Sequence, residues 1–112
     1  MIEVSFFRHE GHLVGFEASG HAGYDAYGRD IVCAAVSAIL QTTLGGIESV
    51  AGVKPRVIRS DRKGYLQVQV PLHTEEARKH DSSVLIESAE VGLRSIAEQY
   101  PDCVRLINKN RR

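Results

Sequence analysis

A polar, glycine-rich segment that runs directly into an apolar helix limits the folds open to this chain more than any other feature. The segment Gly20–Arg29 contains one histidine, three glycines and an aspartate. From Ile31 to about Val50, apolar residues recur at spacings of three and four, which predicts a helix. Asp30 is suited to cap that helix, because a short carboxylate accepts hydrogen bonds from the first free N–H groups. A polar loop held by such a helix is typical of a functional site on a rigid scaffold.

The helix is apolar on most sides, so we expect it to be largely buried. Gly45 and Gly46 are unusual within it, since glycine lowers helix stability. Close packing against a strand or another chain would explain the pair, as would a bend in the helix. These features leave room for a homodimer, which we expect.

Alternating and helical patterns predict the remaining elements of the chain. A second helix is predicted from Val84 to Tyr100, with Thr74 as a candidate cap for an earlier start and the polar segment Arg78–Ser83 as an interruption or loop. Five strands are predicted, at Ile2–Arg8, Leu13–Ala18, Val53–Ser60, Tyr65–Val70 and Cys103–Ile107.

The order is ββαββαβ, and the strands fall mostly into hairpins. This predicts an α+β fold, a two-layer sandwich of a mainly antiparallel sheet with two helices. The length of 112 residues suits one domain, 1–112.

Charge and hydropathy narrow the functions that remain. The 14 basic and 14 acidic residues cancel, which argues against a direct nucleic-acid function, because such binding depends on neutralising phosphates. We see no signal peptide and no apolar run of membrane-spanning length, so we expect a cytoplasmic protein with no membrane partner. The basic tail, 108–112, is expected to be mobile.

Two residues of the central stretch could carry out covalent chemistry. Cys33 falls in the first helical turn, where the helix dipole favours a thiolate and free N–H groups could receive an oxyanion. His21 could act as its base if the loop folds back, with Asp25 as a candidate third member. The alternative is that Cys33 is an inert core residue, since free cysteine often packs as a small apolar side chain. We interpret Cys103 in that structural way.

The central stretch reads Gly20-His21-Ala22, a short variable loop with glycine, and then Asp-Ile-Val-Cys-Ala-Ala-Val-Ser over residues 30–37. A later segment contains Gly92-Leu93, Ile96 and Tyr100-Pro101. In these residues the chain resembles the ribosomal-processing cysteine proteases of bacteria, and the likeness extends along its whole length.

The resemblance implies a cysteine endopeptidase that removes the N-terminal extension of a bacterial large-subunit ribosomal protein during ribosome assembly, cutting after an aromatic residue. It implies that His21 is the base and Cys33 the nucleophile of a Cys/His dyad. Asp30 and Ser37 would support the site. The partners implied are the ribosomal protein precursor and the ribosome.

The loop residues assigned to the substrate are Gly20, Ala22, Gly23 and Gly28. The three glycines permit positive φ and let a peptide approach the backbone. The loop lacks a long apolar anchor, so we expect it to be mobile until substrate orders it. No cofactor or metal is expected.

Two other functions stay open from the residues alone. One is a non-enzymatic ribosome-associated binding module, in which Cys33 belongs to the core and the loop docks a partner. The other is a metal site built from His9, His12, His21 and Cys33, although their spacing is unlike that of known zinc sites.

Overall fold

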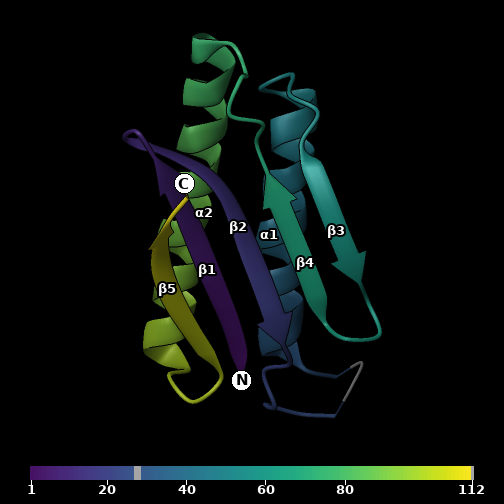
Figure 1. Ribbon diagram of the computed structural model, residues 1–112. Helices are drawn as coiled ribbons and strands as arrows, with labels where there is room; N and C mark the ends of the chain where they lie inside the picture. Colours follow the sequence, from purple (N-terminus) through teal and green to yellow (C-terminus); the bar gives the residue numbers. More distant parts are fainter. Residues whose placement is uncertain (27–28, 112) are drawn as a thin grey trace.

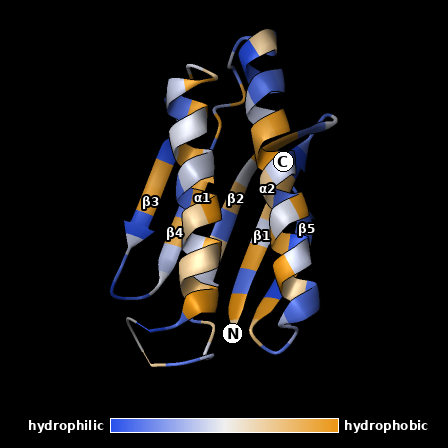
Figure 2. Ribbon diagram, turned by 180° about the vertical axis from the view of Figure 1, so that it is seen from behind, coloured by the Kyte–Doolittle hydropathy of each residue, from blue (hydrophilic) through white to orange (hydrophobic). Residues whose placement is uncertain are grey.

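Five strands form one sheet, and both helices cover the same face of it (Figures 1 and 2). The computed structural model describes residues 1–26 and 29–111. The predicted order and the α+β two-layer fold are confirmed, and the elements in chain order are β1 (Ile2–His9), β2 (His12–Gly20), α1 (Ile31–Ser49), β3 (Arg56–Ser60), β4 (Tyr65–Gln69), α2 (Glu76–Gln99) and β5 (Val104–Asn110).

The strands lie in the order β3-β4-β2-β1-β5, with β1 and β5 parallel and the other pairs antiparallel. A tight turn at Glu10 and Gly11, both with positive φ, joins β1 to β2, and such turns match the twist of paired strands. At the opposite end of β2, Gly20 pairs with Ile2 of β1, while its neighbour Ser19 pairs with Tyr65 of β4. The end of β2 therefore lies beside the start of both flanking strands.

The core lies between the sheet and the helices. Alternate strand residues such as Val4, Phe16 and Val68 point to this side and are fully buried. The helices contribute Ile47 and Leu93, which are equally inaccessible. Each such side chain contributes about 1.5–3 kcal/mol on burial, so this layer fixes the helices on the sheet.

Helix α1 is buried on one face only, contrary to the expectation that it would be largely buried. Small or polar residues such as Ala34, Ala38 and Thr42 lie on its exposed side. Gly46 packs closely against a helix rather than a strand, because a Cβ there would lie 3.2 Å from Cδ1 of Leu85 in α2.

Helix α1 is also long and apolar enough, by length and composition, to cross a membrane, contrary to the sequence-based expectation. Helices in protein cores meet the same criterion, and the buried residues of α1 face the sheet, so this is weak evidence for a membrane.

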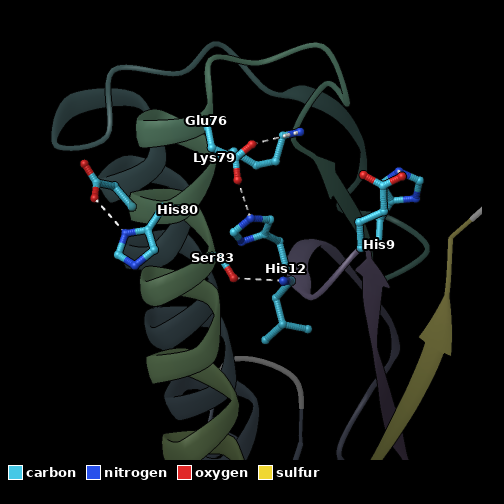
Figure 3. Close-up of polar contacts among 9 residues, drawn as sticks. His9, His12, Glu76, Lys79, His80 and Ser83 are labelled. Carbon is cyan, nitrogen blue, oxygen red and sulfur yellow. Dashed lines mark hydrogen bonds and ion pairs between the residues drawn. The ribbon is translucent and has the colours of Figure 1, made fainter.

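Helix α2 is continuous, so the predicted interruption at Arg78–Ser83 is wrong. Those residues stay helical because Ser83 faces the sheet, where its Oγ accepts a hydrogen bond from the Leu13 N–H at 2.8 Å (Figure 3). Thr74 does not cap the helix, since its hydroxyl donates to the carbonyl of Pro71.

The C-terminal tail is attached to the sheet, contrary to the expected mobility. Strand β5 continues to Asn110, and the N–H of Arg111 donates to the carbonyl of Arg8. The Arg111 guanidinium also donates to the carbonyl of Val70. Arg112 lies outside the described residues.

Strand β3 begins at Arg56, three residues later than predicted, because Val53 instead donates its N–H to the carbonyl of Ile47 behind the α1 C-terminus.

Candidate active site

A cavity of about 310 Å³ opens between α1, the end of β2 and the β3–β4 hairpin. Cys33, Ser37 and Gln41 line it from α1, where the four-residue spacing places them on one stripe of the helix. His21 lines it from the loop after β2. The fold therefore brings the two predicted reactive side chains, twelve positions apart in sequence, to one cavity.

Asp30 caps α1 as predicted. Its Oδ1 accepts hydrogen bonds from the N–H groups of Val32 and Cys33, at 3.0 and 2.9 Å. Its Oδ2 accepts from the N–H groups of Tyr24 and Asp25, at 3.0 and 3.3 Å. One carboxylate thus connects the first helical turn to the loop that carries His21.

The hydrogen bond from the Cys33 N–H is the main cause that lowers the pKa of the Asp30 carboxyl below its ordinary value, with further lowering from the loop N–H groups. Burial acts in the opposite direction and is outweighed. Asp30 is therefore ionised at neutral pH and holds both segments as an anion.

The sulfur of Cys33 contacts the loop directly. The N–H of Ala22 donates to Sγ of Cys33, with 3.2 Å between nitrogen and sulfur. Cys33 is half-buried and free, as is Cys103, and both pack against the edge of the core.

The helix-start N–H groups do not serve as predicted for an oxyanion. Those of Val32 and Cys33 are bonded to the Asp30 side chain, and that of Ala34 donates to the Asp30 carbonyl. The sequence analysis assigned the first N–H groups both to the Asp30 cap and to an oxyanion, and the cap takes those of Val32 and Cys33. Ala22 instead supplies a loop N–H at the sulfur.

The described part of the loop has an apolar anchor that the sequence analysis missed. The ring of Tyr24 meets the ring of Tyr100, at the end of α2, edge to face with centroids 5.5 Å apart. Ala22 is buried in the core. The predicted mobility of the loop stays a prediction.

The predicted loop glycines have the expected backbone where the structure describes them. Gly20 and Gly23 both have positive φ, at 94° and 71°. Gly28 lies outside the described residues. Asp25 directs its carboxylate to the N–H of Ala26 in its own loop, which does not favour a role as third catalytic member.

Sequence reasoning missed the contribution of the β3–β4 hairpin. Its turn closes the cavity opposite α1, and the carbonyl of Gly64 accepts a hydrogen bond from the Gly20 N–H at 3.0 Å. The sequence signals a hairpin turn here, but only the sheet order places β4 beside β2. The lining residues that the sequence analysis missed include Gln41, Asp61, Gly64, Tyr65 and Leu66.

The four residues of the metal-site alternative do not all lie together in the structure. His9 and His12 flank the β1–β2 turn, at the opposite end of β2 from His21. His9 Nδ1 donates to the carbonyl of Arg111. His12 Nε2 donates to the Glu76 carboxylate (Figure 3). Over residues 1–26 and 29–111, no three histidine, cysteine or acidic side chains are grouped as metal ligands would be.

Comparison with known proteins matches this arrangement to one family. The family model described as "Cysteine protease Prp" matches residues 1–105. The ribosomal processing cysteine protease Prp of Bacillus subtilis (strain 168) is 29% identical over 107 residues, which are 95% of this chain and 96% of that protein. The protein of the same name from Staphylococcus aureus (strain Mu50) is 27% identical over 97 residues, 87% of this chain and 88% of that protein.

Solved structures share the whole fold. The crystal structure of the essential ribosomal processing protease Prp from S. aureus, with a covalently linked product peptide, has a TM-score of 0.86 and 26% identity, covering 97% of this chain and 100% of that one. The crystal structure of SMU.848 from Streptococcus mutans has a TM-score of 0.85 and 29% identity, covering 99% of this chain and 96% of that one. Since the family model and these structures span nearly all of the sequence, the chain belongs to the Cysteine protease Prp family, the ribosomal processing cysteine proteases.

Proposed function

We propose that this chain is a cysteine endopeptidase that removes the N-terminal extension of a bacterial large-subunit ribosomal protein precursor during ribosome assembly. The observation that carries the proposal is that His21 and Cys33 line one cavity, with the Ala22 N–H donating to the Cys33 sulfur. Among the relatives, the S. aureus protease has been crystallised with a substrate peptide and with a covalently linked product peptide.

The proposed reaction proceeds through an acyl-enzyme. His21 takes the proton from Sγ of Cys33, and the thiolate attacks the carbonyl carbon of the scissile peptide bond. The carbon–nitrogen bond then breaks as His21 returns the proton to the leaving amine. Water, deprotonated by His21, hydrolyses the thioester and restores the thiol.

The Ala22 N–H has a second role in this scheme. Attack forms a tetrahedral intermediate whose oxyanion is bonded to the same carbon as the sulfur. A donor 3.2 Å from the sulfur is therefore close to where that charge develops. The loop would thus provide an oxyanion donor in place of the Val32 and Cys33 N–H groups, which are bonded to Asp30.

The remaining predicted site residues support the reacting pair. Asp30 holds the loop against the start of the helix, as its four hydrogen bonds indicate. Ser37 lines the cavity one turn beyond Cys33 and is exposed to an incoming peptide. Gly20, Ala22 and Gly23 form the described part of the substrate loop.

The proposal extends to a homodimer that acts in the cytoplasm on the precursor or on the assembling ribosome. The small residues exposed on α1 support a close approach by a second chain, since Ala38 and Thr42 line a shallow groove between α1 and α2. Sedimentation of the purified protein would test the dimer, and a monomer at micromolar concentration would contradict it.

The function is tested by intact-mass analysis of a peptide that covers the extended N-terminus of the ribosomal protein. Wild type should give a single cut after an aromatic residue, and Cys33→Ala should give none while remaining folded. Cys103→Ala is the matched control, because it removes the other free, half-buried thiol and should cut normally. A folded Cys33→Ala variant with wild-type turnover would contradict the dyad.

The same experiment addresses the binding-module alternative. Folded wild-type protein that binds the peptide without cutting it would favour a non-enzymatic role. The rate of Cys33 alkylation by iodoacetamide then separates a binding module from a protease with a different substrate. An inert core cysteine reacts slowly at all accessible pH values, whereas a catalytic cysteine reacts fast.

A further inference from the structure

We infer that Gly64, in the turn between β3 and β4, is a positioning residue for His21, because its missing side chain leaves the space that the imidazole occupies. The inference rests on the proposed role of His21 as the base. Gly64 makes no contact with reacting atoms in this scheme and acts through the orientation of the histidine.

The geometry at Gly64 excludes a side chain. A Cβ at this position would lie 2.8 Å from Cε1 and 3.0 Å from Nε2 of His21, and 2.8 Å from the carbonyl oxygen of Gly20. Contacts that short require a neighbouring atom to move. Gly64 also has φ of +60°, a conformation that glycine and asparagine adopt most readily.

The imidazole is the part that can move. The carbonyl of Gly20 belongs to the backbone at the end of β2, where the Gly20 N–H donates to the Gly64 carbonyl and the adjacent Ser19 pairs with Tyr65. Gly20 is held on its other side by pairing with Ile2. A side chain at position 64 therefore displaces the His21 ring by rotation about its side-chain bonds, while the contact with the Gly20 carbonyl requires a small backbone shift.

Such a displacement acts directly on the reacting pair. His21 and Cys33 line the same cavity, and proton transfer between them requires hydrogen-bonding distance in the substrate complex. A misplacement of about 1 Å typically costs about a hundredfold in rate. The loss should appear in kcat, because the orientation of His21 acts on the proton-transfer step. Any effect of the added side chain on peptide binding should appear in KM, since Gly64 also lines the cavity.

The test compares Gly64→Ala and Gly64→Asn with Gly11→Ala. Gly11 has φ of +84° in the β1–β2 turn, and a Cβ at that position would have no described atom within 4 Å beyond its chain neighbours. Gly11→Ala therefore carries the backbone penalty without the contact. Asparagine tolerates positive φ, so Gly64→Asn carries the contacts with His21 and the Gly20 carbonyl with little penalty from its own φ.

We expect both Gly64 variants to lose about a hundredfold in kcat on the extension peptide, and Gly11→Ala to retain wild-type kinetics. The pH dependence of Cys33 alkylation should change in the Gly64 variants to that of a His21→Ala variant. A merely structural role would lower the melting temperature without changing that profile.

Three results would overturn the inference: wild-type kcat in a folded Gly64→Asn variant, an unchanged alkylation profile, or failure of both Gly64 variants to fold. The His21→Ala variant separates this from failure of the proposed function. If His21→Ala cleaves at the wild-type rate, His21 is not the base. If His21→Ala is inactive while the Gly64 variants are normal, only the role of Gly64 is refuted.

Discussion

The backbone N–H of Ala22 donates a hydrogen bond to the sulfur of Cys33, at 3.2 Å across eleven positions of sequence. This contact fixes the loop onto the first turn of α1, and it directs a donor at the atom that becomes the nucleophile in the proposed reaction. Ala22 itself is buried, so packing against the core holds its N–H in place, although the residue belongs to a loop.

Removing this donor should slow both alkylation and peptide cleavage. Ala22→Pro eliminates the N–H, and a hydrogen bond to a charged group is worth about 1.5–3 kcal/mol, so we expect a loss of about tenfold or more. Ala22→Gly keeps the N–H and is the matched control. Stopped-flow alkylation and peptide hydrolysis measure the two effects, and equal rates for Ala22→Pro and Ala22→Gly would refute the role.

Splitting the two functions of Asp30 should separate helix stability from activity. Asp30→Ser keeps a capping oxygen for the Val32 and Cys33 N–H groups but cannot also reach Tyr24 and Asp25. We expect a melting temperature close to that of wild type and a kcat/KM lower by about tenfold, because the loop loses its anchor. Asp30→Ala should lower both. Wild-type kcat/KM in Asp30→Ser would show that the loop contacts are dispensable.

Filling the cavity from α1 should weaken substrate binding. Ser37 is exposed and lines the cavity of about 310 Å³, so Ser37→Phe should place its ring where the peptide binds. We expect KM to rise by about tenfold, with unfolding free energy within about 0.5 kcal/mol of wild type. Ala38→Phe is the control, since Ala38 is exposed on the same helix but lines the α1–α2 groove. An unchanged KM in Ser37→Phe would place the substrate elsewhere.

The contact between His12 and Glu76 should make stability depend on pH in the acid range. Their hydrogen bond, 2.8 Å long, is the main cause that lowers the pKa of Glu76 below its ordinary value of 4.5 (Figure 3). A carboxyl with a lowered folded-state pKa stabilises the fold above pH 4.5, and this contribution disappears as the pH falls through the folded-state pKa.

Urea unfolding of wild type and Glu76→Gln at neutral pH and near pH 3 checks this expectation. Wild type should be the more stable at neutral pH, and the difference should shrink at the acid value. Glu75→Gln is the control, because the Glu75 carboxylate is exposed and makes only a long ion pair with Arg78 among the described residues. A difference between wild type and Glu76→Gln that is constant with pH would contradict the assignment.

Much of the secondary structure could be predicted from neighbouring residues in the sequence. The Asp30 cap and the alternation in β1, β2 and β4 are set by near neighbours, and the structure bears them out. The prediction for Arg78–Ser83 was wrong because a run of polar residues is typical of a loop. In the folded chain the start of β2 lies against this part of α2. Ser83 accepts the Leu13 N–H across seventy positions, and no local pattern encodes that bond.

Residue types and spacings within one short stretch were enough to indicate the candidate pair His21 and Cys33 and the cap at Asp30, and the resemblance of that stretch and of a later segment indicated the family. They could not indicate what surrounds the pair, which depends on the folded chain. The sheet order brings β4 beside β2 and so places Gly64 against His21, and the folded loop directs the Ala22 N–H at the Cys33 sulfur. Such contacts join atoms whose positions are fixed by strand pairing and core packing, which act between residues far apart in the chain.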